Sequence, residues 1–205
     1  MTEELSNTRR ALHAVAELLI AGPQYVATGD IRLMASSVGF VGRTWTTTGI
    51  SGTDLISPAG RFPLRGRLID LALTAGISPR PLGDVYSGGP DFSVAEPLDV
   101  SPAAADVLLR AFIGGDAALR ALAPDDEPIL WPEHFDIGLS VAEVNYGVSP
   151  GDSAIGEPYA YVGPWQVPSG PFWNQSFGAA RPLSELSTPS AILAFFLAGK
   201  QAADS

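Results

Sequence analysis

The sequence predicts an α+β fold, with a mainly antiparallel sheet and about four helices packed on one of its faces. Some segments carry apolar residues at helical spacing, and others alternate apolar and polar residues as strands do. The 18 prolines and 22 glycines indicate many turns between short strands. With 205 residues the chain is long enough for one sizeable core. We therefore expect residues 1–205 to form a single domain.

The first helix is predicted over residues 8–21. Its apolar stripe consists of residues mostly at three- and four-residue steps: Leu5, Leu12, Val15 and Leu19. Gly22-Pro23 is expected to end this helix, since glycine and then proline commonly follow a helix C-terminus. His13 and Glu17 lie one turn apart on the outer surface, and we expect them to pair with each other.

A second helix is predicted over residues 65–75, with Gly76 as its end. The stretch that follows, residues 78–97, is rich in proline and glycine. We interpret it as a surface loop, and as a candidate flap over a site, because long connections without secondary structure tend to be functional or mobile.

The last two helices are recognisable from their starts. Ser101-Pro102 combines an N-cap residue with a proline in the first turn, and Thr188-Pro189 does the same. The helix that begins at Pro102 contains Gly114-Gly115, where we expect it to bend or break.

Between residues 25 and 56 the pattern is extended, with strands expected at residues 31–33 and 44–48. Arg43 lies in a glycine-flanked loop here and could hold an anionic ligand, although a solvated arginine is the commoner outcome. The glycines do not form a phosphate cradle, because neither G-x-x-x-x-G-K-[ST] nor a G-x-G-x-x-G after a strand is present.

Composition and charge narrow the function classes. The formal charge of −10 and the pI of about 4.5 disfavour nucleic acid and anionic membrane surfaces as partners. No segment approaches the ~20 apolar residues of a membrane span. The acidic start lacks the basic region of a secretory signal, so we expect a cytoplasmic protein. The absence of cysteine excludes disulfides, thiolate metal sites and cysteine nucleophiles.

Residues 130–178 are the most informative part of the chain, because aromatic and acidic residues gather there with one of the two histidines. If residues 133–141 form a strand, alternation places His134 and Asp136 on one face. A partner strand at residues 159–165 would present Tyr159, Tyr161 and Trp165 beside them, with residues 145–158 as the connection. Such a face resembles sites for small organic molecules.

Three functions are compatible with this face. The leading hypothesis is binding of a small organic molecule, with His134 and Asp136 as polar anchors or as catalytic acid–base groups. The first alternative is a hydrolase or lyase that uses His134 as general acid or base. The second is an interaction protein whose aromatic face forms a homodimer interface. The ligand-binding residues that we predict are Tyr159, Tyr161, Trp165, Asn145, Asp152, Trp173 and Arg43.

A second core is the structural alternative to a pocket, with Phe172-Trp173 and the loop at residues 84–92 covering the aromatic face. A metal site is also conceivable through four oxygen and nitrogen ligands: His134, Asp136, Asp152 and Glu157. With one usable histidine and no H-E-x-x-H motif, however, we predict neither a metal nor a cofactor.

Four phrases in this region, together with their order, carry a resemblance to a known family. They are L-W-P-E-H-F-D at 130–136, N-Y-G-V-S-P-G-D at 145–152, E-P-Y-A-Y-V-G-P-W at 157–165 and F-W-N-Q-S-F-G-A at 172–179. The chain resembles a family of uncharacterised actinobacterial proteins over most of its length. This resemblance implies no activity, so no catalytic residue is carried over. The chain departs from the family pattern at residues 38–43, where V-G-F-V-G-R replaces G-G-F-G-T-P.

Overall fold

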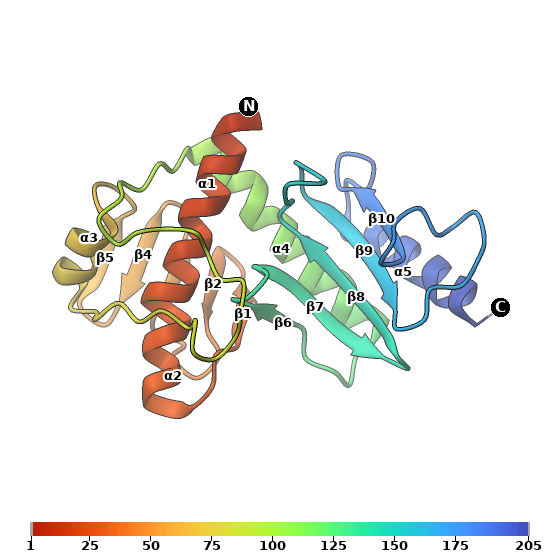
Figure 1. Cartoon of the computed structure of the whole chain (residues 1–205), viewed down its shortest axis with the longest axis horizontal. Coiled ribbons are helices and arrows are strands. Elements are labelled where there is room, and N and C mark those ends of the chain that lie inside the picture. The colour runs from red at the N-terminus through yellow and green to blue at the C-terminus, as the bar shows by residue number, and fades with distance from the viewer. Residues whose placement is uncertain (1, 205) are drawn as a thin grey trace. The chain divides into compact units, whose positions relative to one another are not determined.

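The computed structural model describes residues 2–204 and divides the chain into two compact units (Figure 1). Unit 1 comprises residues 1–110 and 130–135, and unit 2 comprises residues 111–129 and 136–205. The described residues contain four continuous helical segments and ten strands. Because the paired strands are antiparallel, the predicted α+β class is confirmed.

Unit 1 contains an antiparallel sheet in the order β6-β1-β2-β3-β4-β5. β1 to β5 form a meander, and Leu33 of β1 pairs with Leu130 of β6. Phe40 and Leu55, in the middle of β2 and β4, are fully buried. The strands are β1 (Leu33–Ser36), β2 (Gly39–Gly42), β3 (Gly49–Ser51), β4 (Asp54–Ser57), β5 (Gly60–Pro63) and β6 (Ile129–Trp131).

The first helical segment is longer than predicted. α1 (Thr2–Val15), η1 (Ala16–Ala21) and α2 (Gly22–Thr28) are continuous, and η1 is a π-helix. The prediction that Gly22-Pro23 ends the helix is therefore wrong. Proline lacks the N–H that a helix interior needs, and the chain widens to a π turn in which the Gly22 N–H donates to Glu17 O. The segment ends instead at Gly29, whose φ is 73°.

A loop from later in the chain completes the hydrogen bonding at this π turn. Leu18 O can receive no bond from Pro23, and the Arg80 N–H donates to it at 2.9 Å. A Cβ at Gly22 would overlap the carbonyl oxygen of Arg80, so only glycine permits this close approach. The Gly-Pro pair that resembles a stop signal is thus the place where the loop docks on the helix.

The next two helices begin and end near the predicted residues. α3 (Leu68–Ala75) ends at Gly76, which has a φ of 69°. α4 (Pro102–Leu122) begins at the predicted proline and runs without interruption through Gly114-Gly115, so the break expected there is absent. A Cβ at Gly115 would lie 2.9 Å from Val148 Cβ. Gly115 therefore allows close packing of the helix on the strands of unit 2.

Unit 2 contains a four-stranded antiparallel sheet in the order β7-β8-β9-β10. α5 (Pro189–Ala203), capped by Thr188 as predicted, packs on one face with Gly199 against Val162. On the same face Tyr146 meets Phe196 edge-on, with 5.8 Å between ring centroids (Figure 1 shows α5 behind the sheet). The strands are β7 (Asp136–Val141), β8 (Val144–Ser149), β9 (Tyr159–Pro164) and β10 (Ala179–Pro182).

Residues 44–48 do not form the predicted strand. They make the bend and turn between β2 and β3, closed by a bond from Thr48 N–H to Trp45 O at 2.9 Å. The buried side chain of Gln24 accepts the backbone N–H groups of Thr44 and Trp45 through its Oε1. Because these donors are already used, they cannot join a strand ladder.

The two strands predicted in residues 133–165 also differ from the structure. β7 begins at Asp136 rather than at Glu133, because residues 132–135 form a turn in which Phe135 has a φ of 53°. Residues 145–149, expected in a connection, belong to β8, which lies between β7 and β9. β7 and β9 are therefore not direct neighbours. No helix in the described part of the chain has the length and apolar character needed to cross a membrane.

Candidate functional site

Polar and aromatic side chains meet on the face of the unit 2 sheet that α5 does not cover. Alternation along β7 puts Asp136 and Gly138 on this face. The register continues the row from Gly138 to Gly147 of β8 and then to Tyr161 of β9. A Cβ at Gly147 would lie 2.5 Å from Tyr161 Cζ, and one at Gly138 would lie 3.0 Å from Tyr161 Oη. The phenol of Tyr161 thus lies across two strands in the space that two glycines leave.

This placement brings Tyr161 to Asp136. The Tyr161 hydroxyl donates a hydrogen bond to Asp136 Oδ2. Asp136 is only 9% exposed, so the hydroxyl replaces water that the carboxylate loses on folding. Burial, and then the negative charge of Asp136, raises the pKa of Tyr161 well above its usual value. The hydroxyl is therefore a donor at neutral pH, and the prediction that Asp136 and Tyr161 share a face is confirmed.

A second phenol–carboxylate pair lies beside the first. Tyr159 Oη donates to Asp152 Oδ2 at 2.7 Å, and the ring centroids of Tyr159 and Tyr161 are 6.4 Å apart. Burial, followed by the hydrogen bond to Asp152, raises the pKa of Tyr159 to about 12. Asp152 itself is exposed, and its Oδ1 accepts the N–H groups of Ala154 and Ile155. This carboxylate therefore closes the turn between β8 and β9 as well as holding Tyr159.

Asn145 stands at the open side of the same face. It is exposed, it lies opposite Ser140 in the ladder, and its Oδ1 accepts the Ser140 hydroxyl at 2.6 Å. Its amide group can both donate and accept, so an exposed group on this face can pair with either kind of ligand atom.

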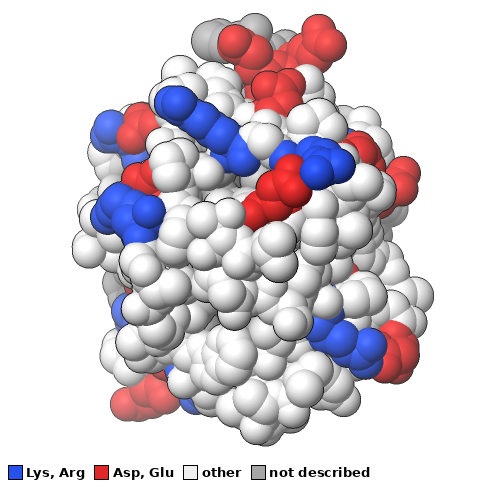
Figure 2. Space-filling view, turned by 90° about the vertical axis from the view of Figure 1, so that its left-hand side faces the viewer, with Lys and Arg blue, Asp and Glu red and all other residues white. Residues whose placement is uncertain are grey.

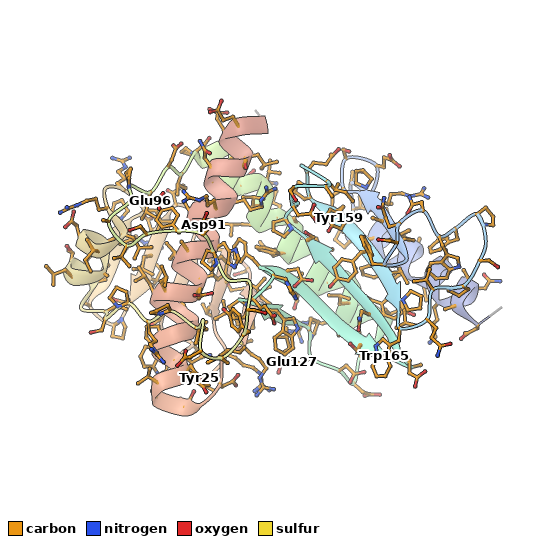
Figure 3. The ribbon with its side chains drawn as sticks, in the orientation of Figure 1. Tyr25, Asp91, Glu96, Glu127, Tyr159 and Trp165 are labelled. Carbon is orange, nitrogen blue, oxygen red and sulfur yellow. The ribbon has the colours of Figure 1, made fainter. Side chains whose placement is uncertain are left out.

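The three-ring floor of tyrosines and tryptophan is not what the structure shows. β9 ends at Pro164, and Trp165 beyond it is 67% exposed. Figure 3 shows Tyr159 and Trp165 near opposite ends of that strand. The ring that contacts Tyr161 is Phe177, edge-on at 6.5 Å between centroids. The aromatic part of the face therefore consists of Tyr159, Tyr161 and Phe177.

Trp173 belongs to a separate aromatic group. Its ring meets Phe172 edge-on at 5.0 Å, and Phe172 stacks on Phe195 of α5 at 5.5 Å. The guanidinium of Arg181 lies 5.7 Å from the Phe195 ring centroid. The alternative in which Phe172 covers the tyrosine face does not fit this position, because the Phe172 ring packs on the helix.

His134 and Arg43 lie in unit 1, whereas Asp136 and Tyr161 lie in unit 2. His134 is on the turn before β7, its side chain is 71% exposed, and its Nε2 is 3.9 Å from Glu133 Oε1. That distance exceeds a hydrogen bond. Strand alternation cannot relate His134 to Asp136, since Phe135 between them has a left-handed φ. Arg43 lies near a carboxylate of its own unit, with 3.5 Å between its guanidinium and Asp30 Oδ2.

Unit 1 contains a buried carboxylate that the sequence interpretation placed at the surface. Glu17 is 4% exposed. Its Oε1 accepts the Leu82 N–H at 3.2 Å, and its Oε2 accepts the Tyr86 hydroxyl at 2.7 Å. Burial and this hydrogen bond raise the pKa of Tyr86. The signal that could have revealed Glu17 is its place inside the otherwise apolar run A-V-A-E-L-L-I-A at residues 14–21.

His13 does not make its predicted pair with Glu17. Its ring stacks on Phe135 at 5.1 Å, and its Nε2 lies 2.7 Å from Pro132 O. Burial lowers the pKa of His13 from 6.5 to about 4, so the imidazole is neutral at pH 7. It then donates through Nε2 to the carbonyl, which is a structural role.

The two units differ in the ratio of acidic to basic residues. Unit 1 contains nine of the 12 basic residues and 12 of the 22 acidic ones, whereas unit 2 contains three and ten. Figure 2, a view onto the α3 end of unit 1, shows several acidic and basic side chains adjoining one another around an uncharged centre. Because unit 2 has few basic residues, it carries the larger share of the net negative charge. Ion pairs in unit 1 include Arg10–Glu96, Arg32–Asp30, Arg61–Asp54, Arg67–Asp70 and Arg80–Asp84.

The described residues contain no group of three or more histidine, cysteine, aspartate or glutamate side chains arranged to hold a metal ion. The four ligands considered from the sequence, His134, Asp136, Asp152 and Glu157, are accordingly not brought together in such a group.

Comparison with known proteins gives no match: no family model, no curated protein and no solved structure matches this chain. The resemblance to an actinobacterial family stays a prediction, and the chemistry of the site is argued from its own residues.

Proposed function

We propose that unit 2 binds a small organic molecule on the polar and aromatic face of the β7–β10 sheet. The observation that carries this proposal is the row formed by Asp136, Gly138, Gly147 and Tyr161, in which a phenol crosses two strands to reach a carboxylate. Flat aromatic surface next to a few convergent polar groups is the usual composition of a small-molecule site.

The accessible side of the face supplies the contacts to the ligand. Asn145 and Asp152 are exposed, whereas Asp136 and Tyr159 are nearly buried. In this arrangement Asn145 and Asp152 contact the ligand, and the buried pairs hold the tyrosine rings in position. Carboxylate and amide oxygens lie beside the rings, and such acceptors favour a ligand with hydroxyl or amino groups.

A library of small hydroxylated and amino compounds, screened by ligand-observed NMR, tests this proposal. Asn145→Ala removes the accessible amide, and Tyr161→Phe removes the hydroxyl that links β9 to β7. Thr74→Ala, at an exposed position of α3 in unit 1, is the control. We expect at least one compound whose binding is weakened tenfold or more by Asn145→Ala and is unchanged by Thr74→Ala. A screen without binders, or binders that are indifferent to both face variants, contradicts the proposal.

One observation favours the homodimer as a second function. Trp165 and Val167, directly beyond β9, are 67% and 41% exposed. Exposed large apolar side chains that lie together often mark a protein contact. Sedimentation at rising concentration checks this: a dimer that Trp165→Ser dissociates supports it, and a monomeric mass at all concentrations contradicts it.

The enzyme alternative has less support. A general acid–base histidine works best when a carboxylate orients it within hydrogen-bond distance, and the Glu133 carboxylate lies 3.9 Å from His134. His134 is moreover 71% exposed, so it does not line an enclosed site.

A further inference from the structure

Residues 83–92 of unit 1 lie over Glu17 with little burial of their own. They have no regular secondary structure, and between the buried Leu82 and Leu98 no residue is buried. Segments with few buried apolar contacts open locally at a smaller free energy than the whole fold. We infer that residues 83–92 form a lid that opens as a unit and gives solvent access to the Glu17 carboxylate.

Both ends of the lid are anchored by backbone hydrogen bonds. On the N-terminal side, Arg80 N–H donates to Leu18 O of the π turn at 2.9 Å. On the C-terminal side, the start of α3 holds the chain: Ile69 N–H donates to Val94 O at 2.9 Å, and Leu98 N–H donates to Gly66 O at 2.8 Å. These anchors define where a movement begins and ends.

Between the anchors, side-chain contacts that include the following two hold the lid on the helix. The first is the hydrogen bond from the Tyr86 hydroxyl to Glu17 Oε2. The second is Arg10, whose Nε donates to Asp91 O at 2.8 Å and whose guanidinium lies 4.7 Å from the Phe92 ring centroid. Figure 3 labels Asp91 beside the N-terminal half of α1. Both contacts are polar or cation–π, so water can replace them.

The lid closes tightly over the carboxylate that it covers. A Cβ at Gly89 would overlap Glu17 Oε2, so the backbone of the lid rests directly on the acid. Gly88 has a φ of 114°, which favours glycine at this point. In the closed position, Tyr86 and Gly89 therefore both lie against the Glu17 carboxylate.

Cleavage by chymotrypsin under native conditions tests the inference, because Tyr86 and Phe92 are cleavage positions inside the lid. Tyr86→Phe keeps an aromatic cleavage position and removes the hydroxyl. Tyr25→Phe, on the half-buried Tyr25 of α2, is the matched control. A lost hydrogen bond to a carboxylate corresponds to a rise of about tenfold or more in the open population, and in the cleavage rate at residues 86 and 92.

Hydrogen exchange of the Leu82 amide, which donates to Glu17, provides the second readout. We expect it to exchange faster than the amide of Leu12, and without dependence on low urea concentrations. Exchange of both amides at one rate with one urea dependence would show that the lid opens only on global unfolding, which overturns the inference. Equal cleavage rates of the Tyr86→Phe and Tyr25→Phe variants would show that the Tyr86 hydroxyl does not keep the lid closed, which contradicts its role in the inference.

Discussion

Glu17 of unit 1 and Asp136 of unit 2 are stabilised by the same kind of hydrogen bond, but from different backbone elements. Each is a nearly buried carboxylate that accepts a tyrosine hydroxyl, from Tyr86 and from Tyr161 respectively. Tyr86 belongs to an exposed loop, whereas Tyr161 belongs to a strand with partners on both sides. A loop can move away from its carboxylate without breaking a ladder, and a central strand cannot. The tyrosine–carboxylate hydrogen bond can therefore break when the loop of unit 1 moves, whereas in unit 2 it is a fixed part of the sheet.

Exposed carboxylates of unit 1 have a different partner, since Asp70 and Asp84 are paired with arginine. A phenol suits a buried carboxylate better, because it donates a hydrogen bond without bringing a second charge that also loses its water. The position of each acid therefore decides which partner stabilises it.

The largest effect is expected from filling the glycine row of unit 2. In Gly147→Val the new side chain would meet the Tyr161 ring and the carbonyl of Ile137. We expect a loss of about 3 kcal/mol in the free energy of unfolding, measured by urea titration. Gly156→Val is the control, because nothing lies within 4 Å of a Cβ there. Equal losses in both variants would mean that Tyr161 does not need the space over Gly147.

Removal of single hydroxyls should have the next largest effect and separates buried from exposed acids. Tyr161→Phe leaves the buried Asp136 without this donor, and we expect a loss of about 2 kcal/mol. Tyr159→Phe should cost about 1 kcal/mol, because water can reach the exposed Asp152. A larger loss in the free energy of unfolding for Tyr159→Phe than for Tyr161→Phe, measured by urea titration, would show that burial of the carboxylate does not set the size of the effect.

The free energy of unfolding should depend on pH because the buried His13 has a lowered pKa. Its pKa is about 4 in the folded chain and 6.5 in the reference state, so the unfolded state binds more protons between these values. Stability contributed by the neutral imidazole is complete at neutral pH and is lost as the pH falls through this window. We expect a decrease of about 1 kcal/mol between pH 7 and pH 5.5. His13→Gln should abolish it, and an unchanged slope in that variant would contradict the assignment.

The smallest effect is expected at the surface. Arg67 and Asp70 form an exposed ion pair, with 2.7 Å between Nε and Oδ2 and side chains that are 58% and 55% exposed. Surface pairs of this kind contribute little. Arg67→Ala should leave the midpoint of urea unfolding unchanged within experimental error. A clear shift would show that exposed ion pairs of unit 1 contribute as much to the free energy of unfolding as the buried hydrogen bond of Glu17.

Local chemistry made part of this structure predictable. Thr188-Pro189 and Pro102 start helices and Gly76 ends one, since caps act through their immediate neighbours. Alternation placed Asp136 on a common face with Gly138, and Tyr159 with Tyr161, because side chains of a strand alternate whatever the strand packs against. These predictions depend only on neighbouring residues and need no knowledge of the rest of the chain.

The failures share one cause, which is that distant groups changed the local preference. Gly22-Pro23 does not end its helix, because Arg80 supplies a hydrogen bond that proline cannot. Residues 44–48 do not extend, because Gln24 takes two of their donors. His134 is separated from the strand by the left-handed φ of Phe135, whose ring is drawn into the core beside His13 and Phe40.

The sequence by itself therefore determined the class of the fold, several helix ends and the faces of two strands, all of which depend on residues close together in the chain. Only the tertiary structure decided that β8 lies between β7 and β9, that Tyr161 crosses two glycines to Asp136, and that Glu17 lies beneath a loop more than 60 residues away. Burial and hydrogen-bond satisfaction act between residues that folding brings together, and their spacing along the chain carries no record of it.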